Sequence, residues 1–164
     1  MVSVPPKLAL DTSCLRKVRH GSRAYASIID SGRRGTPFGL PAPAYFEVAY
    51  GARRIEAAGG RSARSLMKRF GLLTRLLRIR MLVELPFGAE AADLAAYLRA
   101  AMPMPERRGA STSVSWTIDL MIAAVAAEHG HAIVSYNIRD FDLIAVALPA
   151  PLRLPIMHPS VVGW

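Results

Sequence analysis

Apolar residues recur along the chain with two spacings, and each spacing predicts one kind of element. In residues 61–80 they return every three or four positions, at Leu66, Phe70, Leu73 and Leu77, which is typical of an amphipathic helix. Shorter apolar runs between Gly, Pro and polar residues predict β-strands. The predicted strands cover residues 7–11, 38–41, 81–85, 132–135 and 152–157, and a loop is expected at 102–109. The other predicted helices run through 23–30, from Pro43 to Gly59, and over 89–101 and 116–128.

Strands that alternate with helices predict an α/β fold in three layers, with a mostly parallel central sheet of about four or five strands flanked by helices. The 164 residues are enough to bury one core and too few to divide comfortably into two, so we expect a single domain over residues 1–164. The one cysteine, Cys14, excludes an internal disulfide and a zinc cluster, which favours a reducing compartment, by default the cytoplasm. We expect no signal peptide and no membrane span, because no apolar run is long enough.

The chain is strongly basic, with 21 Lys and Arg against 12 acidic residues, a net charge of +9 and a pI near 10.6. Such a balance favours a polyanionic partner, and nucleic acid is the natural one. Nearly all of the basic residues are Arg, so the excess can equally be solubilising charge or the product of a GC-rich genome. Within residues 61–80 the basic residues fall on one helical face: Arg61, Arg64, Lys68, Arg75 and Arg78.

Four carboxylates lie among apolar residues at or near the ends of predicted elements. Taken singly, each has an ordinary explanation, such as a favourable place in the first turn of a helix. Together they are harder to explain by caps and solvated faces, because burying an unpaired carboxylate costs on the order of several kcal/mol. Functional groups in open α/β sheets gather beyond the carboxyl ends of the strands, where the first of the four stands. They are Asp11, Glu47, Asp119 and Asp140.

Clustered carboxylates either share protons or bind a cation. Oxygen ligands without Cys or His at metal spacing suit Mg²⁺ or Mn²⁺ rather than zinc. With a polyanionic partner, the chemistry that fits is metal-dependent phosphodiester hydrolysis. The basic face of residues 61–80 is then a candidate for holding the flanking nucleic-acid backbone.

The ordered motifs resemble those of PIN-domain ribonucleases, and most of all the VapC-type toxins of bacterial type II toxin–antitoxin modules. The similarity extends from Leu8 to about Met157. Its strength lies in the order and spacing of the motifs rather than in any one of them. They are Asp11-Thr12-Ser13 after a strand, Glu47 in a helix, Asp119-Leu-Met-Ile-Ala-Ala124, Glu128-His-Gly130, and Ile133-Val-Ser-Tyr-Asn137-Ile-Arg-Asp140-Phe141.

The resemblance implies that Asp11, Glu47, Asp119 and Asp140 form an acidic site for Mg²⁺ or Mn²⁺. Asp142 is an alternative to Asp140, but it lies outside the matched pattern. Polar neighbours are expected to orient the carboxylates and position water. These neighbours are Thr12, Ser13, Ser135 and Asn137.

The resemblance further implies an endoribonuclease toxin that acts on an RNA substrate, forms a homodimer and is held inactive by a cognate antitoxin protein. Two alternatives stay open: a PIN nuclease in RNA processing without an antitoxin, and a catalytically silent PIN-like module that binds nucleic acid or protein. Trp116 and Tyr136 are candidates for stacking on bases, although packing explains them equally well. Cys14 is expected to be a small buried residue rather than a nucleophile.

Overall fold

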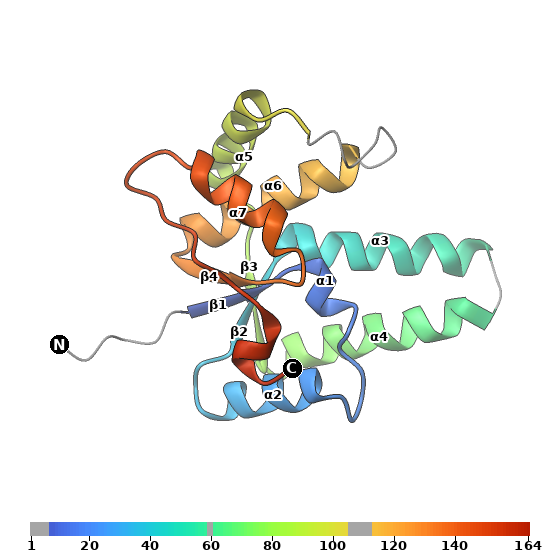
Figure 1. Cartoon of the computed structure of the whole chain (residues 1–164). Coiled ribbons are helices and arrows are strands. Elements are labelled where there is room, and N and C mark those ends of the chain that lie inside the picture. Colours follow the sequence, from blue (N-terminus) through green and yellow to red (C-terminus); the bar gives the residue numbers. More distant parts are fainter. Residues whose placement is uncertain (1–6, 59–60, 105–112) are drawn as a thin grey trace.

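The computed structural model describes residues 7–58, 61–104 and 113–164 and contains a sheet of five parallel strands in the order β3-β2-β1-β4-β5 (Figure 1). The first strand lies in the middle of the sheet, where Leu8 pairs with Ala132 of β4 and Ala9 pairs with Gly39 of β2. The predicted parallel sheet is therefore confirmed. The strands are β1 (Lys7–Leu10), β2 (Phe38–Pro41), β3 (Leu82–Leu85), β4 (His131–Val134) and β5 (Ile156–Met157).

Helices cover both sides of the sheet, which gives the expected three layers. Helices α5, α6 and α7 gather on one side, and α2 and α4 lie on the other (Figure 1). Helices α3 and α4 run antiparallel and extend away from the sheet as a pair. The helices are α1 (Thr12–Leu15), α2 (Arg23–Arg33), α3 (Ala42–Ala58), α4 (Arg61–Arg78), α5 (Ala89–Ala101), α6 (Ser113–Glu128), α7 (Ile138–Ala147) and the 3₁₀ helix η3 (Pro159–Val162).

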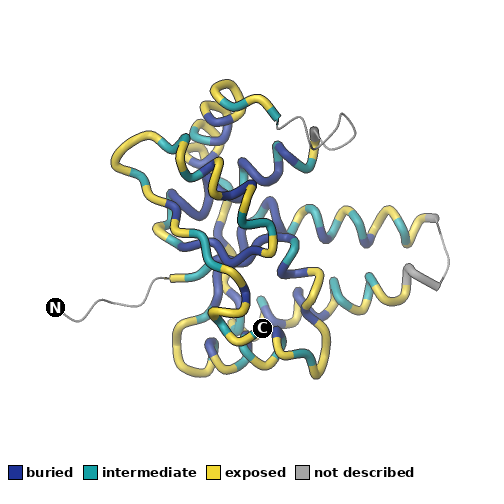
Figure 2. The backbone as a smooth tube through the Cα atoms, in the orientation of Figure 1, coloured by how far each residue is buried: buried dark blue, intermediate teal, exposed yellow. Residues whose placement is uncertain are grey.

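The buried residues concentrate on the sheet and on the inner faces of its covering helices, whereas the far ends of α3 and α4 are more exposed (Figure 2). Helix α6 is buried over most of its length, including Trp116, Leu120 and Val125, because it packs against α3, α5, α7 and strand β4. This explains why its sequence is apolar on nearly every face. No helix in the described segments is both long and apolar enough to cross a membrane.

Two predicted boundaries were wrong for identifiable reasons. The strand expected at 152–157 is only Ile156–Met157, because Pro155 lies within the expected range and cannot donate a backbone hydrogen bond to the sheet. The helix expected at 61–80 ends at Arg78, and the chain then turns through the left-handed conformation at Arg80, which has a φ of 59°. Helices α1 and α7 were not predicted. The predicted loop at 102–109 is non-helical at 102–104, and its remainder lies outside the described residues.

Candidate active site

Asp11 lies directly after β1, at the carboxyl end of the central strand, and is only 3% exposed. Its Oδ1 accepts hydrogen bonds from the Ser13 hydroxyl at 2.8 Å and from the Cys14 backbone N–H at 2.9 Å. The second bond makes Asp11 the N-cap of α1, which is why the chain leaves the strand into a helix at this point. Its Oδ2 accepts a 2.7 Å bond from the Ser135 hydroxyl. The carboxylate is therefore fixed in orientation by three uncharged donors.

A continuous hydrogen-bonded network joins Asp11 to Asp140 across the ends of two neighbouring strands. Val134 of β4 pairs with the residue preceding Asp11, so Ser135 arrives beside the carboxylate. The Asn137 backbone N–H donates to Ser135 Oγ at 2.8 Å, and the Asn137 side chain donates from Nδ2 to Asp140 Oδ2 at 2.8 Å. The Ser13 hydroxyl in turn accepts a bond from the Tyr136 backbone N–H at 3.0 Å. Three of the four expected supporting residues thus contact a candidate carboxylate directly.

Thr12 differs from the other supporting residues. It is buried, and its Oγ1 has no hydrogen-bond partner in the described part of the chain. The Thr12 hydroxyl therefore makes no hydrogen bond to a candidate carboxylate among the described residues.

Glu47 projects from α3, which contacts α1. Its side chain is 19% exposed, and Oε1 lies 3.3 Å from the guanidinium of Arg16. Arg16 was not among the residues predicted for the site; the available signal was a basic residue five positions after Asp11. The ion pair holds Glu47 beside the helix that Asp11 caps.

Asp119 and Asp140 are both buried, at 8% and 4% exposure, and each has interactions of its own within the molecule. Asp119 lies on α6, which packs against both α3 and α7. Asp140 lies in the first turn of α7, where a negative charge is favoured by the helix dipole. Asp142, the alternative, is exposed to solvent. Burial and the bond from Asn137 favour Asp140 over Asp142.

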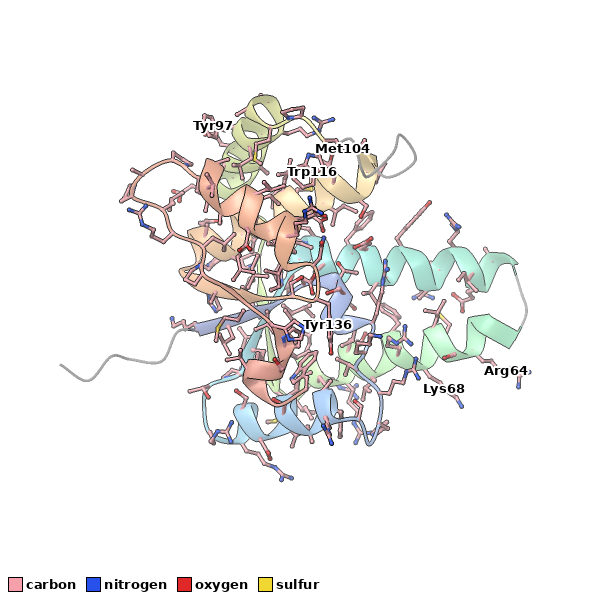
Figure 3. All side chains as sticks on the ribbon, viewed as in Figure 1. Arg64, Lys68, Tyr97, Met104, Trp116 and Tyr136 are labelled. Carbon is pink, nitrogen blue, oxygen red and sulfur yellow. The ribbon has the colours of Figure 1, made fainter. Side chains whose placement is uncertain are left out.

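The aromatic candidates separate clearly. Trp116 is fully buried in the core, whereas Tyr136 is 42% exposed at the carboxyl end of β4 (Figure 3). The Lys17 ammonium lies 5.8 Å from the centre of the Tyr136 ring, and the His158 ring packs edge-on against it. Packing therefore accounts for Trp116, and Tyr136 is the one of the two that a base could reach.

Cys14 is buried, and its thiol donates a hydrogen bond to the Val134 carbonyl at 3.2 Å. Burial raises the pKa of this thiol far above its ordinary value, and the negative charge of Asp11 raises it further. The residue is therefore a neutral packing group and not a nucleophile.

The donor chemistry of the site fits a hard cation such as Mg²⁺ or Mn²⁺, because it consists of carboxylate and hydroxyl oxygens. Asp11 meets only uncharged donors, so its charge is left for a cation to neutralise. Among the described residues, however, no three His, Cys, Asp or Glu side chains lie close enough to form a ready metal site. The structure brings Asp11 and Asp140 into one network and places Glu47 on a neighbouring helix, but it does not gather the four carboxylates around one point.

The fold is shared with several solved structures. VapBC2 from Rickettsia felis, bound to a DNA fragment from its promoter, is 15% identical with a TM-score of 0.60, covering 92% of this chain and 97% of the other. DNA-bound VapBC from Salmonella typhimurium is 18% identical with a TM-score of 0.58 over 93% and 98%. VapBC-1 from nontypeable Haemophilus influenzae is 16% identical with a TM-score of 0.54 over the same shares.

A search of curated protein sequences gave no match. The family model of the PIN domain, by contrast, matches residues 8–147, which include every candidate carboxylate and every supporting polar residue. The match extends from β1 through α7 and thus covers the strands that carry the Asp11 network. The chain belongs to the PIN-domain family.

Proposed function

We propose that this protein is a divalent-metal-dependent endoribonuclease that hydrolyses RNA phosphodiester bonds in the cytoplasm, as the toxin of a type II toxin–antitoxin pair. The observation that carries the proposal is the buried network from Asp11 through Ser135 and Asn137 to Asp140. Two buried carboxylates at the carboxyl ends of β1 and β4 would not help to stabilise the fold alone, because burying each charge costs free energy. Membership of the PIN-domain family and the resemblance to VapC-type toxins support the same function.

In this proposal Asp11, Glu47, Asp119 and Asp140 hold Mg²⁺ or Mn²⁺. The bound ion would supply an activated water molecule and neutralise charge that develops on the phosphate. The hydroxyls of Ser13 and Ser135 hold Asp11 in one orientation, and Asn137 does the same for Asp140. The Arg16 guanidinium limits the rotation of Glu47.

The first test is cleavage of a mixed cellular RNA pool by the purified protein in Mg²⁺, Mn²⁺ or EDTA. We expect metal-dependent cuts that disappear in Asp140→Asn and persist in Asp142→Asn. The two substitutions remove the same charge two positions apart, so loss of cutting in Asp140→Asn excludes a contaminating nuclease and Asp142→Asn controls for the change in net charge. Cutting that persists in EDTA or in Asp140→Asn would overturn the proposed mechanism. Intact RNA with a folded, metal-loaded protein would favour the silent binding module.

The proposed partners are an antitoxin and a second copy of the chain. The solved relatives are VapBC assemblies, two of them bound to DNA, and this supports a protein partner of the same kind. We expect expression of the chain alone to arrest growth, and co-expression of a small protein encoded next to it to restore growth. Light scattering should give twice the chain mass of 17.8 kDa. Growth arrest without any neighbouring antidote would instead favour a PIN nuclease of RNA processing.

A further inference from the structure

A basic cavity lies between helix α4 and the loop that joins α1 to α2. Its volume is about 630 Å³, within the range of ligand sites in proteins. Figure 3 shows Arg64 and Lys68 projecting from α4 on the side away from α3. None of the candidate active-site residues lines this cavity, and neither does any acidic residue. Its lining consists of Val18, Arg19, His20, Arg64, Ser65, Lys68, Arg69 and Leu72.

Positive charges line this cavity, and the acidic residues that the structure describes do not pair with them. In the described residues the side chains of Arg19, Arg64, Lys68 and Arg69 make no ion pair. The Nε atom of Arg69 is buried and has no hydrogen-bond partner. Burial lowers the pKa of the Arg69 guanidinium, and the charges of Arg19 and Arg16 lower it further. A buried guanidinium N–H without an acceptor is unfavourable. An anion in the cavity would accept a hydrogen bond from this N–H, whereas an apolar side chain would only fill the space.

The cavity also adjoins the acidic site along the chain. Arg16 contacts Glu47, and Val18 and Arg19 of the cavity follow within three residues. The chain therefore leads directly from the residue that pairs with Glu47 into the basic lining of the cavity. Arginine presents a planar set of N–H donors that matches the oxygens of a phosphate group.

We propose that this cavity binds the phosphodiester backbone of the RNA substrate at a position away from the bond that is cut. This inference rests on the proposed ribonuclease function and extends it, since it assigns a second point of substrate contact. Arg64, Lys68 and Arg69 on α4 face the phosphate from one side, and Arg19 faces it from the other. The contact is with the backbone, so it confers affinity and orientation and not sequence choice.

The test compares two double variants. Arg64→Gln with Lys68→Gln removes two exposed cations of the cavity, and Arg33→Gln with Arg34→Gln removes two exposed cations at the end of α2, outside the cavity. Both are built on Asp140→Asn so that RNA stays intact. Fluorescein-labelled oligouridylates of increasing length are titrated by anisotropy at several salt concentrations.

We expect the cavity variant to bind the longer oligouridylates about tenfold more weakly, with a salt dependence shallower by about 0.7 per lost phosphate contact. The control variant should change the affinity and its salt dependence much less. In the active background the cavity variant should raise KM and leave kcat near its original value. Equal losses in the two double variants would overturn the proposal, even if the protein cuts RNA. Failure of the active protein to cut RNA would instead refute the underlying function.

A variant of Arg69 is expected to change the stability of the protein and its affinity for RNA in opposite directions. Arg69→Met removes a half-buried charge whose Nε has no hydrogen-bond partner among the described residues, so it should raise the unfolding midpoint of the protein while weakening RNA binding. If the unfolding midpoint and the RNA affinity both fall, Arg69 contributes to the packing of α4 and its role in the cavity is overturned. Fluorescein-labelled polyglutamate is titrated in parallel. Tighter binding of this peptide than of oligouridylate would assign the cavity to an acidic protein partner and overturn the RNA proposal.

Discussion

Ser135 provides the most direct test of the network at the strand ends. Its side chain is completely buried, donates to Asp11 Oδ2 at 2.7 Å and accepts from the Asn137 N–H at 2.8 Å. Ser135→Ala leaves Asp11 Oδ2 and the half-buried Asn137 N–H without their hydrogen bond to this side chain, while Asp11 Oδ1 keeps its two donors. Each unsatisfied group costs about 1–3 kcal/mol, so we expect the free energy of unfolding to fall by about 2–4 kcal/mol once the site has partly relaxed. That is a large part of the ~5–15 kcal/mol that stabilises a typical domain.

The assay is urea and thermal unfolding followed by circular dichroism, with Ser160→Ala as the matched control. Ser160 loses a hydrogen bond of similar length, 2.9 Å to His158 Nδ1, but it is exposed, so water replaces the lost partner. We expect the midpoint of Ser135→Ala to fall by roughly 5–15 °C and that of Ser160→Ala to change little. A double-mutant cycle with Asp11→Asn should give a coupling of about 1 kcal/mol or more. Indistinguishable effects of the two serine substitutions would refute the reasoning.

Four further outcomes are expected. Asp119→Asn should abolish RNA cleavage and growth inhibition with little change in the unfolding midpoint; an active variant would remove this residue from the metal site. Gly39→Ala should destabilise the protein by about 1–3 kcal/mol, because the added Cβ would lie 2.6 Å from the Leu85 side chain of β3. Gly71→Ala has open space around it, so in the same denaturation assay it should stabilise α4 by about 0.5–1 kcal/mol. Because its pKa is raised by burial, the Cys14 thiol should resist iodoacetamide at about pH 8 until urea unfolds the chain, and fast alkylation of the folded protein would contradict this. Burial lowers the pKa of His131 below 6.5. The stability that its neutral form contributes is therefore present above pH 6.5 and lost as the pH falls through the lower pKa of the folded state. Unfolding midpoints measured across pH should show a smaller acid-induced loss of stability in His131→Gln.

The sheet could be predicted because its strands are short apolar runs between clear breaks. Buried parallel strands have this pattern on both faces, and the run before Asp11 is an example. Helix α7 could not be predicted in the same way. It begins Ile-Arg-Asp-Phe-Asp, and only the tertiary contacts of Phe141 and Ile144 show which of its faces is buried. The last strand was predicted too long because its apolar residues were given more weight than Pro155 among them.

The candidate site was predictable in part. An acidic residue directly after a buried strand is visible in sequence, and so are hydroxyl residues within three positions of the strand ends. The bond between Ser135 and Asp11 depends on the pairing of β1 with β4, which no local pattern reveals. Arg16 and Arg69 were missed because their importance lies in what surrounds them: a glutamate on α3 in one case and unpaired cations in the other.

The order of the strands has a consequence for how the protein is made. Asp11 and Ser135 are 124 positions apart, yet β1 is the central strand and β4 is its neighbour. At a translation rate of about 5–20 residues per second, Asp11 waits roughly 6–25 s on the ribosome before its partner is synthesised. A nascent chain, or one truncated before β4, has no means of completing the Asp11 network. Under the proposed function, RNA cleavage is therefore expected only once synthesis is nearly finished, so incomplete copies of the chain are expected to be harmless to the cell that makes them.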